Sequence, residues 1–167
     1  MHGRESRHKA AVGPMANPLR RVIYGGTTAV VTSMAVIVGL NLATAGRSAV
    51  VASLLIIALA DNLTDSLGVH VYQEAERLAQ RDAFRTTVTN FAARLGVALS
   101  FVAIVVLLRW SVATLTALIW GLSLLCFLSY WLARTRRANP VSEMLKHCAV
   151  ATVVVVLSAA IGLWLKG

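Results

Sequence analysis

The chain has 167 residues, of which 57% are hydrophobic and only 14% are charged. Its 16 Lys and Arg against 7 Asp and Glu give a net charge of +9, which in a soluble domain would first suggest nucleic-acid binding. So few charges do not cover a water-solvated globule of this length, and they cluster between long apolar runs. This pattern is typical of a polytopic membrane protein and argues against a nucleic-acid partner.

Five apolar segments follow a basic tail, residues 1–18, which we expect to be disordered near anionic lipid headgroups. The third segment is short, so we expect it to cross a membrane only if Arg94 and Arg109 both extend toward the interfaces. A short cytoplasmic helical connection is predicted at 73–92. The predicted fold class is all-α, a five-helix membrane domain over 19–167, with spans at about 22–43, 49–72, 93–109, 111–133 and 144–165.

The basic residues predict the orientation of these spans. Most Lys and Arg fall on the side of the N-terminus, and only Arg47, Arg109 and Lys166 fall on the other side. This positive-inside distribution predicts a cytoplasmic N-terminus and an outer C-terminus. A cleaved signal peptide ending near Ala43-Thr44-Ala45 is the alternative, although the apolar stretch before it is longer than a typical signal sequence needs.

Helix starts are marked twice by the same dipeptide. Asn17-Pro18 precedes the first span and Asn139-Pro140 precedes the fifth. Asn is a favoured N-cap residue, and Pro at the first helical position loses no hydrogen bond there. We expect both helices to begin in water and to run into the bilayer.

The second span carries carboxylates on one helical stripe, formed by Asp61, Asp65, Gly68, Tyr72 and Glu76. An ionised carboxylate in the middle of a span costs about 2.5 to 3.5 kcal/mol on insertion scales. Two of them one turn apart also repel each other, so a bound proton or cation is the natural compensation. Oxygen ligands on one stripe suit a hard divalent cation. The structural alternative is that these polar residues hydrogen-bond across helices, or that Asp65 reaches the hydrated surface.

The first span offers a small, weakly polar face opposite these carboxylates. Gly25, Thr28, Thr32, Ala35 and Gly39 share this face, which lets another helix approach closely. Two interpretations stay open: the face lines an ion path, or it serves helix packing only.

Signatures of enzyme chemistry are missing from the sequence. It contains no nucleophile elbow, phosphate-binding glycine loop or HExxH motif, and its four histidines are scattered. Cys126 and Cys148 lack metal-binding or redox spacing, so we interpret them as small hydrophobic residues of the bundle. We therefore expect no enzyme and no resident cofactor.

The order of these features resembles the vacuolar iron transporter family, the VIT and CCC1-like iron and manganese transporters. The likeness rests on YGGTTAVVTSMAVIVG at 24–39, TDSLGVH at 64–70 and ANPVSEMLK at 138–146. The chain also departs from the family pattern. Thr28 stands where the first-span motif has an aspartate, and Asp65 and Val69 stand where the second-span motif has a methionine and then a glutamate. The cytoplasmic insertion is short, and the third-span prolines are absent.

The resemblance implies proton-coupled export of Fe²⁺ or Mn²⁺ from the cytoplasm by a homodimer whose first spans meet around a central path. Asp61 and Asp65 would then bind the metal ion or the exchanged protons, and Glu74 with Glu76 would form the cytoplasmic entrance. Thr28, Thr32, Asn62 and Tyr72 are expected to line the path. A bacterial inner membrane is the expected location. The alternative, motivated by Thr28, is a transport-inactive membrane scaffold or partner subunit.

Overall fold

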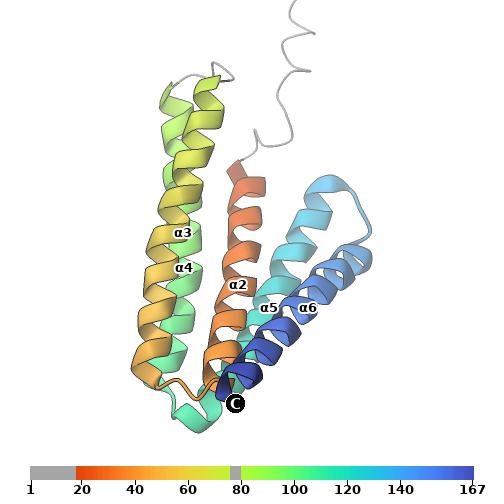
Figure 1. Ribbon diagram of the computed structural model, residues 1–167. Coiled ribbons are helices and arrows are strands. Elements are labelled where there is room, and N and C mark those ends of the chain that lie inside the picture. Colours follow the sequence, from red (N-terminus) through yellow and green to blue (C-terminus); the bar gives the residue numbers. More distant parts are fainter. Residues whose placement is uncertain (1–17, 76–79) are drawn as a thin grey trace, which may run out of the picture.

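The computed structural model describes residues 18–75 and 80–167, which form a bundle of helices (Figure 1). The all-α fold class is therefore confirmed for the described chain. The expected basic tail lies outside the described residues except for Pro18. The helices are α2 (Pro18–Leu42), α3 (Arg47–Ala75), α4 (Gln80–Leu107), α5 (Trp110–Arg136) and α6 (Pro140–Lys166).

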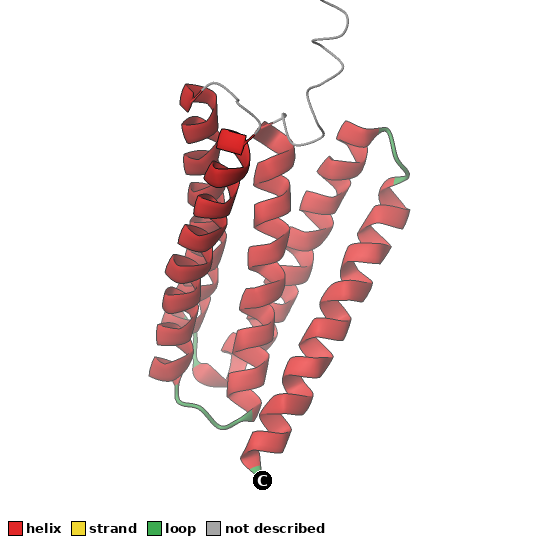
Figure 2. Cartoon of the chain, turned by 45° about the horizontal axis from the view of Figure 1, so that its top comes forward, coloured by secondary structure: helices red, strands yellow, loops and turns green. Residues whose placement is uncertain are grey.

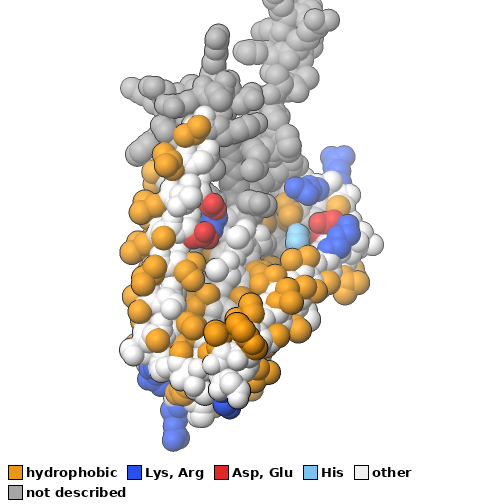
Figure 3. All heavy atoms as spheres, in the orientation of Figure 1, with side chains coloured by type: hydrophobic (Ala, Val, Ile, Leu, Met, Phe, Trp, Pro, Cys, Tyr) orange, Lys and Arg blue, Asp and Glu red, His pale blue; other side chains and the backbone are white. Residues whose placement is uncertain are grey.

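All five helices contain a stretch long and apolar enough to cross a membrane. Large hydrophobic side chains also cover much of the outside of the bundle, among them Leu63 on α3, Ile119 on α5 and Val153 on α6. Apolar side chains dominate the face drawn in Figure 3. Such a surface is unusual for a soluble monomer. The five apolar helices are consistent with a multi-pass membrane protein. The stretches are Gly25–Leu42, Arg47–Gly68, Thr87–Leu107, Trp110–Arg136 and Pro140–Lys166.

Helix α4 is longer than the third span expected from the sequence. It begins at Gln80, well before residue 93, and its apolar stretch begins at Thr87. Residues 80–92, most of the connection expected at 73–92, therefore belong to the same helix as the third span. The reason is that Arg94 does not end the apolar stretch: it lies inside the bundle, with only 3% of its side chain exposed.

Side chains complete the hydrogen bonding at several helix ends. Asn139 caps α6, because its side-chain oxygen accepts from the backbone N–H of Val141 at 3.0 Å and Pro140 follows it, as the sequence predicts. Arg47, at the start of α3, donates to the carbonyl oxygen of Leu108 at 2.9 Å just after the end of α4. Carbonyl groups at the end of a helix have no partner within the helix, so this bond ties α3 to α4 at one end of the bundle.

Helix α2 is the centre of the bundle. It contacts each of the other four helices, with the α3–α4 pair on one side and the α5–α6 pair on the other (Figures 1 and 2). Its side chains Val30, Met34 and Ile37 are fully buried in a core shared with Phe101 of α4 and Leu125 of α5. None of the described side chains of α2 is exposed. The central helix is therefore the one whose residues can meet both pairs.

The small face of α2 packs against two different helices. Gly39 lies at the crossing with α6, where an added Cβ would come within 3.1 Å of the carbonyl oxygen of Ser158. Gly25 lies instead against α4, beside Asn90 and Arg94. Part of this face thus serves helix packing, which is one of the two interpretations left open by the sequence. Thr32, between the two glycines, lines a cavity described below.

Candidate functional site

A buried arginine joins the two aspartates that the sequence singles out. Arg94 projects from α4 toward α3, and its Nη2 donates to Asp61 Oδ2 at 2.7 Å. Its Nη1 forms an ion pair with Asp65 Oδ2. Asp61 and Asp65 lie one turn apart on the same face of α3, so the two terminal nitrogens of one guanidinium can reach both carboxylates. We call these three residues the charged trio.

The members of the charged trio differ in exposure. The Arg94 side chain is 3% exposed, whereas the side chains of Asp61 and Asp65 are 48% and 45% exposed. The guanidinium therefore binds the carboxylates from inside the bundle, and each carboxylate keeps an open side. Figure 3 shows acidic and basic side chains together partway along the α3 side of the bundle, apart from the other charged side chains on that face. Two carboxylates and one guanidinium leave the trio with one net negative charge.

Gly25 makes room for the arginine. A Cβ added at this position would overlap Asn90 Oδ1 and come within 2.9 Å of Arg94 Cγ. Any side chain at position 25 would thus push on the aliphatic part of Arg94. The close approach of α2 to α4 at this glycine helps to hold the guanidinium against α3.

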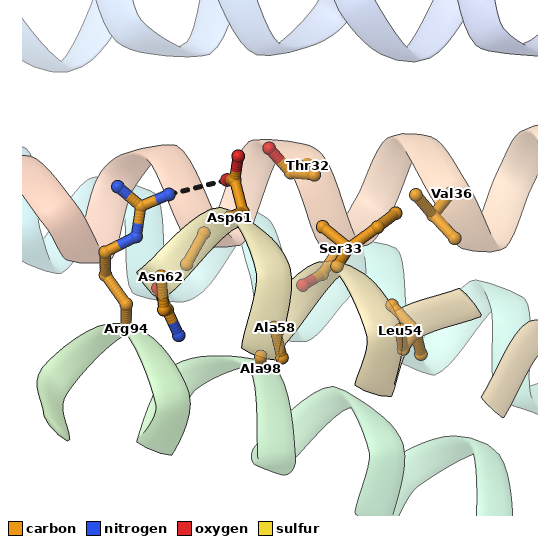
Figure 4. A pocket seen from close by; sticks show the side chains of 11 residues that line it. Thr32, Ser33, Val36, Leu54, Ala58, Asp61, Asn62, Arg94 and Ala98 are labelled. Carbon is orange, nitrogen blue, oxygen red and sulfur yellow. Dashed lines mark hydrogen bonds and ion pairs between the residues drawn. The ribbon is translucent and has the colours of Figure 1, made fainter. Parts of the chain in front are cut away.

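A cavity of about 20 Å³ lies beside the charged trio, between α2, α3 and α4 (Figure 4). This volume is enough for about one water molecule. In Figure 4, Thr32 of α2 and the carboxylate of Asp61 lie on the same side of the cavity. The lining residues are Ala29, Thr32, Ser33, Val36, Leu54, Ile57, Ala58, Asp61, Asn62, Arg94 and Ala98.

Several buried polar atoms near this cavity have no hydrogen-bond partner among the described residues. They are Asn62 Nδ2, Ser66 Oγ and Arg94 Nε. Asn62 and Arg94 are both buried, and both line the cavity. Buried polar groups in proteins normally have a partner. These atoms therefore make the region between α3 and α4 a place that favours a polar ligand or water.

Several of the predicted site residues meet here. Asp61 and Asp65 are joined by Arg94, and the predicted path residues Thr32 and Asn62 line the cavity with Asp61. Thr28 is half-buried on α2 one turn from Thr32, but it does not line this cavity.

Three further predicted residues are not tested by the structure. Tyr72 and Glu74 belong to the last turns of α3, where their side chains are outside the described part. Glu76 lies wholly outside the described residues. The entrance expected from Glu74 and Glu76 stays a prediction.

Among the described residues of one copy, the aspartates do not form a complete metal site. Over residues 18–75 and 80–167, no group of three or more His, Cys, Asp and Glu side chains is placed to hold a metal ion. The nearest partner of both carboxylates is instead Arg94. Sequence reasoning treated this arginine as an interfacial residue and so missed it. The available signal was the uncharged stretch 86–93 before it, which extends the apolar character of the helix past Arg94.

The part-buried side-chain contacts between α5 and α6 join neutral groups, unlike the charged contacts between α3 and α4. Ser129 Oγ and His147 Nδ1 share a hydrogen bond of 2.8 Å, and the sulfur atoms of Cys126 and Cys148 are 3.8 Å apart. Both thiols are free and half-buried, as expected for small residues within a bundle. The charged pair Glu143 and Lys146 lies near the start of α6, at 3.1 Å. Among the described residues, the charges within the bundle interior thus gather between α3 and α4.

Comparisons with protein-family models, with curated proteins and with solved structures found no match to this chain.

Proposed function

We propose that the protein is a five-span membrane transporter that exports a divalent metal cation, Fe²⁺ or Mn²⁺, from the cytoplasm in exchange for protons. The observation that carries this proposal is the charged trio, which places two half-exposed carboxylates inside a bundle of apolar helices. Ionisable residues within membrane spans are costly, and they typically mark ion pathways and proton relays. The resemblance of the sequence to the vacuolar iron transporter family also supports this proposal.

The topology of this proposal follows from the distribution of charge. The basic residues favour a cytoplasmic N-terminus and an outer C-terminus, and a bacterial inner membrane fits this arrangement. The lipid would contact the apolar outer faces of α3, α5 and α6, where Leu63, Ile119 and Val153 are exposed. The same faces would be unfavourable in water.

A homodimer would supply ligands beyond those found among the described residues of one copy. Thr28, Thr32 and Val36 form a half-buried stripe on α2, and Thr32 lies on the same side of the cavity as the Asp61 carboxylate (Figure 4). A second copy that covered this side would bring a second pair of aspartates toward the first. More carboxylate oxygens would then face one path, as a divalent cation requires. This arrangement keeps the expected dimer along the first span, although α2 is also central within each copy.

A second function is favoured by one specific observation. Arg94 occupies both aspartates, and Thr28 offers no carboxylate opposite them. An arginine held permanently in this position would make the trio a structural link between α3 and α4. The protein would then be a transport-inactive scaffold or partner subunit.

Proteoliposomes separate the two functions. Purified protein is reconstituted in vesicles that contain a metal-sensitive dye, and Mn²⁺ or Fe²⁺ is added outside under an imposed proton gradient. Molecules inserted with the cytoplasmic side outward should carry metal into the vesicles faster than protein-free vesicles take it up. If the dye signal for both metals stays at the level of protein-free vesicles, with or without the proton gradient, the transporter is contradicted and the scaffold is favoured.

A further inference from the structure

The charged trio is bound from two directions. Arg94 reaches the aspartates from inside the bundle, where its side chain is 3% exposed. Asp61 and Asp65 are 48% and 45% exposed, so each also keeps a side that Arg94 does not cover. A cation arriving at the open side therefore meets two carboxylates that each already bind a fixed cation through one oxygen, Oδ2.

Charge prevents both cations from being held together. The trio carries one net negative charge, so a divalent ion added to it would leave one net positive charge inside an apolar bundle. An unbalanced charge in such a place is costly, and two cations on the same carboxylates repel each other. With the guanidinium withdrawn, two carboxylates and one divalent ion are neutral.

The structure also offers the guanidinium an alternative position. Asn90 Oδ1 lies beside the Arg94 side chain, since both would touch a Cβ added at Gly25. This amide oxygen can accept a hydrogen bond from a guanidinium that leaves the aspartates. Asn62 Nδ2, buried and without a partner among the described residues, also lines the cavity and suits a ligand oxygen or water there.

We infer that Arg94 is a tethered competitor of the transported ion: the metal binds Asp61 and Asp65 only as the guanidinium leaves them, and the returning guanidinium expels the metal. This inference rests on the proposed function and deepens it, because it names Arg94 as the residue that keeps the site from retaining its cargo. The residue is a positioning residue for release of the ion and is not itself a ligand.

Equilibrium Mn²⁺ binding to the purified full-length protein in detergent tests this inference. Replacement R94Q removes the competing charge, so its affinity for Mn²⁺ should rise about tenfold or more over the unmodified protein. R94K keeps a charge but cannot bridge both carboxylates, and should give an intermediate affinity. R109Q removes an exposed arginine outside the trio and should leave the affinity unchanged.

A second pair of variants keeps the test valid if R94Q does not fold. D61N leaves Arg94 paired with Asp65, and R94Q/D61N leaves Asp65 free; the double variant should bind Mn²⁺ more tightly than D61N. The competitor role is overturned if R94Q binds Mn²⁺ no more tightly than the unmodified protein, or if R94Q/D61N binds it no more tightly than D61N. The proposed transport function still stands in that case if the unmodified protein takes up metal. Absence of both binding and uptake in every variant overturns the transporter and the competitor role together.

Discussion

Two pairs of helices pack on opposite sides of α2, and they are held together by different chemistry. The pair α3 and α4 shares the buried guanidinium of Arg94 and its two aspartates. The pair α5 and α6 shares neutral contacts, the hydrogen bond between Ser129 and His147 and the contact of two thiols. Since α5 and α6 pack without buried ions, helix packing here does not require them. Burying the Arg94 guanidinium between α3 and α4 is costly, and the proposed binding of an ion by its two half-exposed partners would account for that cost.

The largest effect is expected from removing both carboxylates of the trio. In D61N/D65N the Arg94 side chain, 3% exposed, keeps its charge without a carboxylate to balance it. Breaking a buried ion pair from one side costs about 3 to 5 kcal/mol, so this variant should unfold at a clearly lower temperature or denaturant concentration. Thermal unfolding of the purified protein in detergent measures the loss. The neutral triple variant R94Q/D61N/D65N is the control and should regain most of the stability; a double variant as stable as the unmodified protein would show that Arg94 is hydrated.

Gly25→Ala should have the next largest effect. Its Cβ would overlap Asn90 Oδ1 and press on Arg94, and overpacking of this kind costs about 1 to 3 kcal/mol. Thermal unfolding gives the loss, and Mn²⁺ binding should change with it because Arg94 moves. Gly96→Ala on α4 is the matched control: a Cβ there meets nothing within 4 Å, so its stability should be unchanged or slightly higher.

An equivalent change on the neutral side of the bundle sharpens the comparison. A Cβ at Gly162 of α6 would overlap the carbonyl oxygen of Gly39 on α2. Gly162→Ala should lose about as much stability as Gly25→Ala, about 1 to 3 kcal/mol, while Mn²⁺ binding by the folded fraction stays as in the unmodified protein. Equal changes in metal binding in the two alanine variants would contradict a site confined to α2, α3 and α4.

Ser129→Ala should have a smaller effect. It removes the 2.8 Å hydrogen bond to His147 between α5 and α6, and one such bond contributes about 1 kcal/mol net. Ser123→Ala is the control, because Ser123 Oγ donates only to the Ile119 carbonyl of its own helix and is exposed. Denaturant unfolding should rank Ser129→Ala below Ser123→Ala. The reverse order would mean that α5 and α6 do not meet as described.

The smallest expected effect on the molecule is a cross-link between α5 and α6. The Cys126 and Cys148 sulfur atoms are 3.8 Å apart, and a disulfide needs them at about 2.05 Å, a short movement for two side chains. Mild copper-phenanthroline oxidation should join them within one chain and remove both free thiols, as mass spectrometry after alkylation can show. C126S should block this product. If cross-links formed only between chains, the described contact of Cys126 with Cys148 between α5 and α6 of one chain would be contradicted.

The helices of this molecule could be predicted from the sequence because the relevant signals are local. Apolar length marks each span, Asn139-Pro140 marks the start of α6, and spacing places Asp61 and Asp65 on one face of α3. These signals depend only on residues of the same helix. The all-helical fold and the shared face of the aspartates followed from them.

The partner of the aspartates could not be predicted in this way. Which residue of α4 faces α3 depends on how the two helices pack, and the charge of Arg94 made it resemble the end of a span. The same limit applies to Gly25 and Gly39: they share a face of α2, but they contact α4 and α6 respectively. Sequence spacing assigns a residue to a face, and only the packed bundle assigns a neighbour to that face.

Metal uptake by proteoliposomes with one carboxylate neutralised tests the central claim most directly. D61N keeps the Arg94 charge paired with Asp65, so the protein should stay folded, yet its initial rate of proton-dependent Mn²⁺ uptake should fall about tenfold or more. E143Q neutralises a carboxylate on α6 that pairs with Lys146 away from the charged trio, and should keep the rate of the unmodified protein. Equal uptake by D61N and E143Q would contradict the claim that the charged trio binds the transported ion.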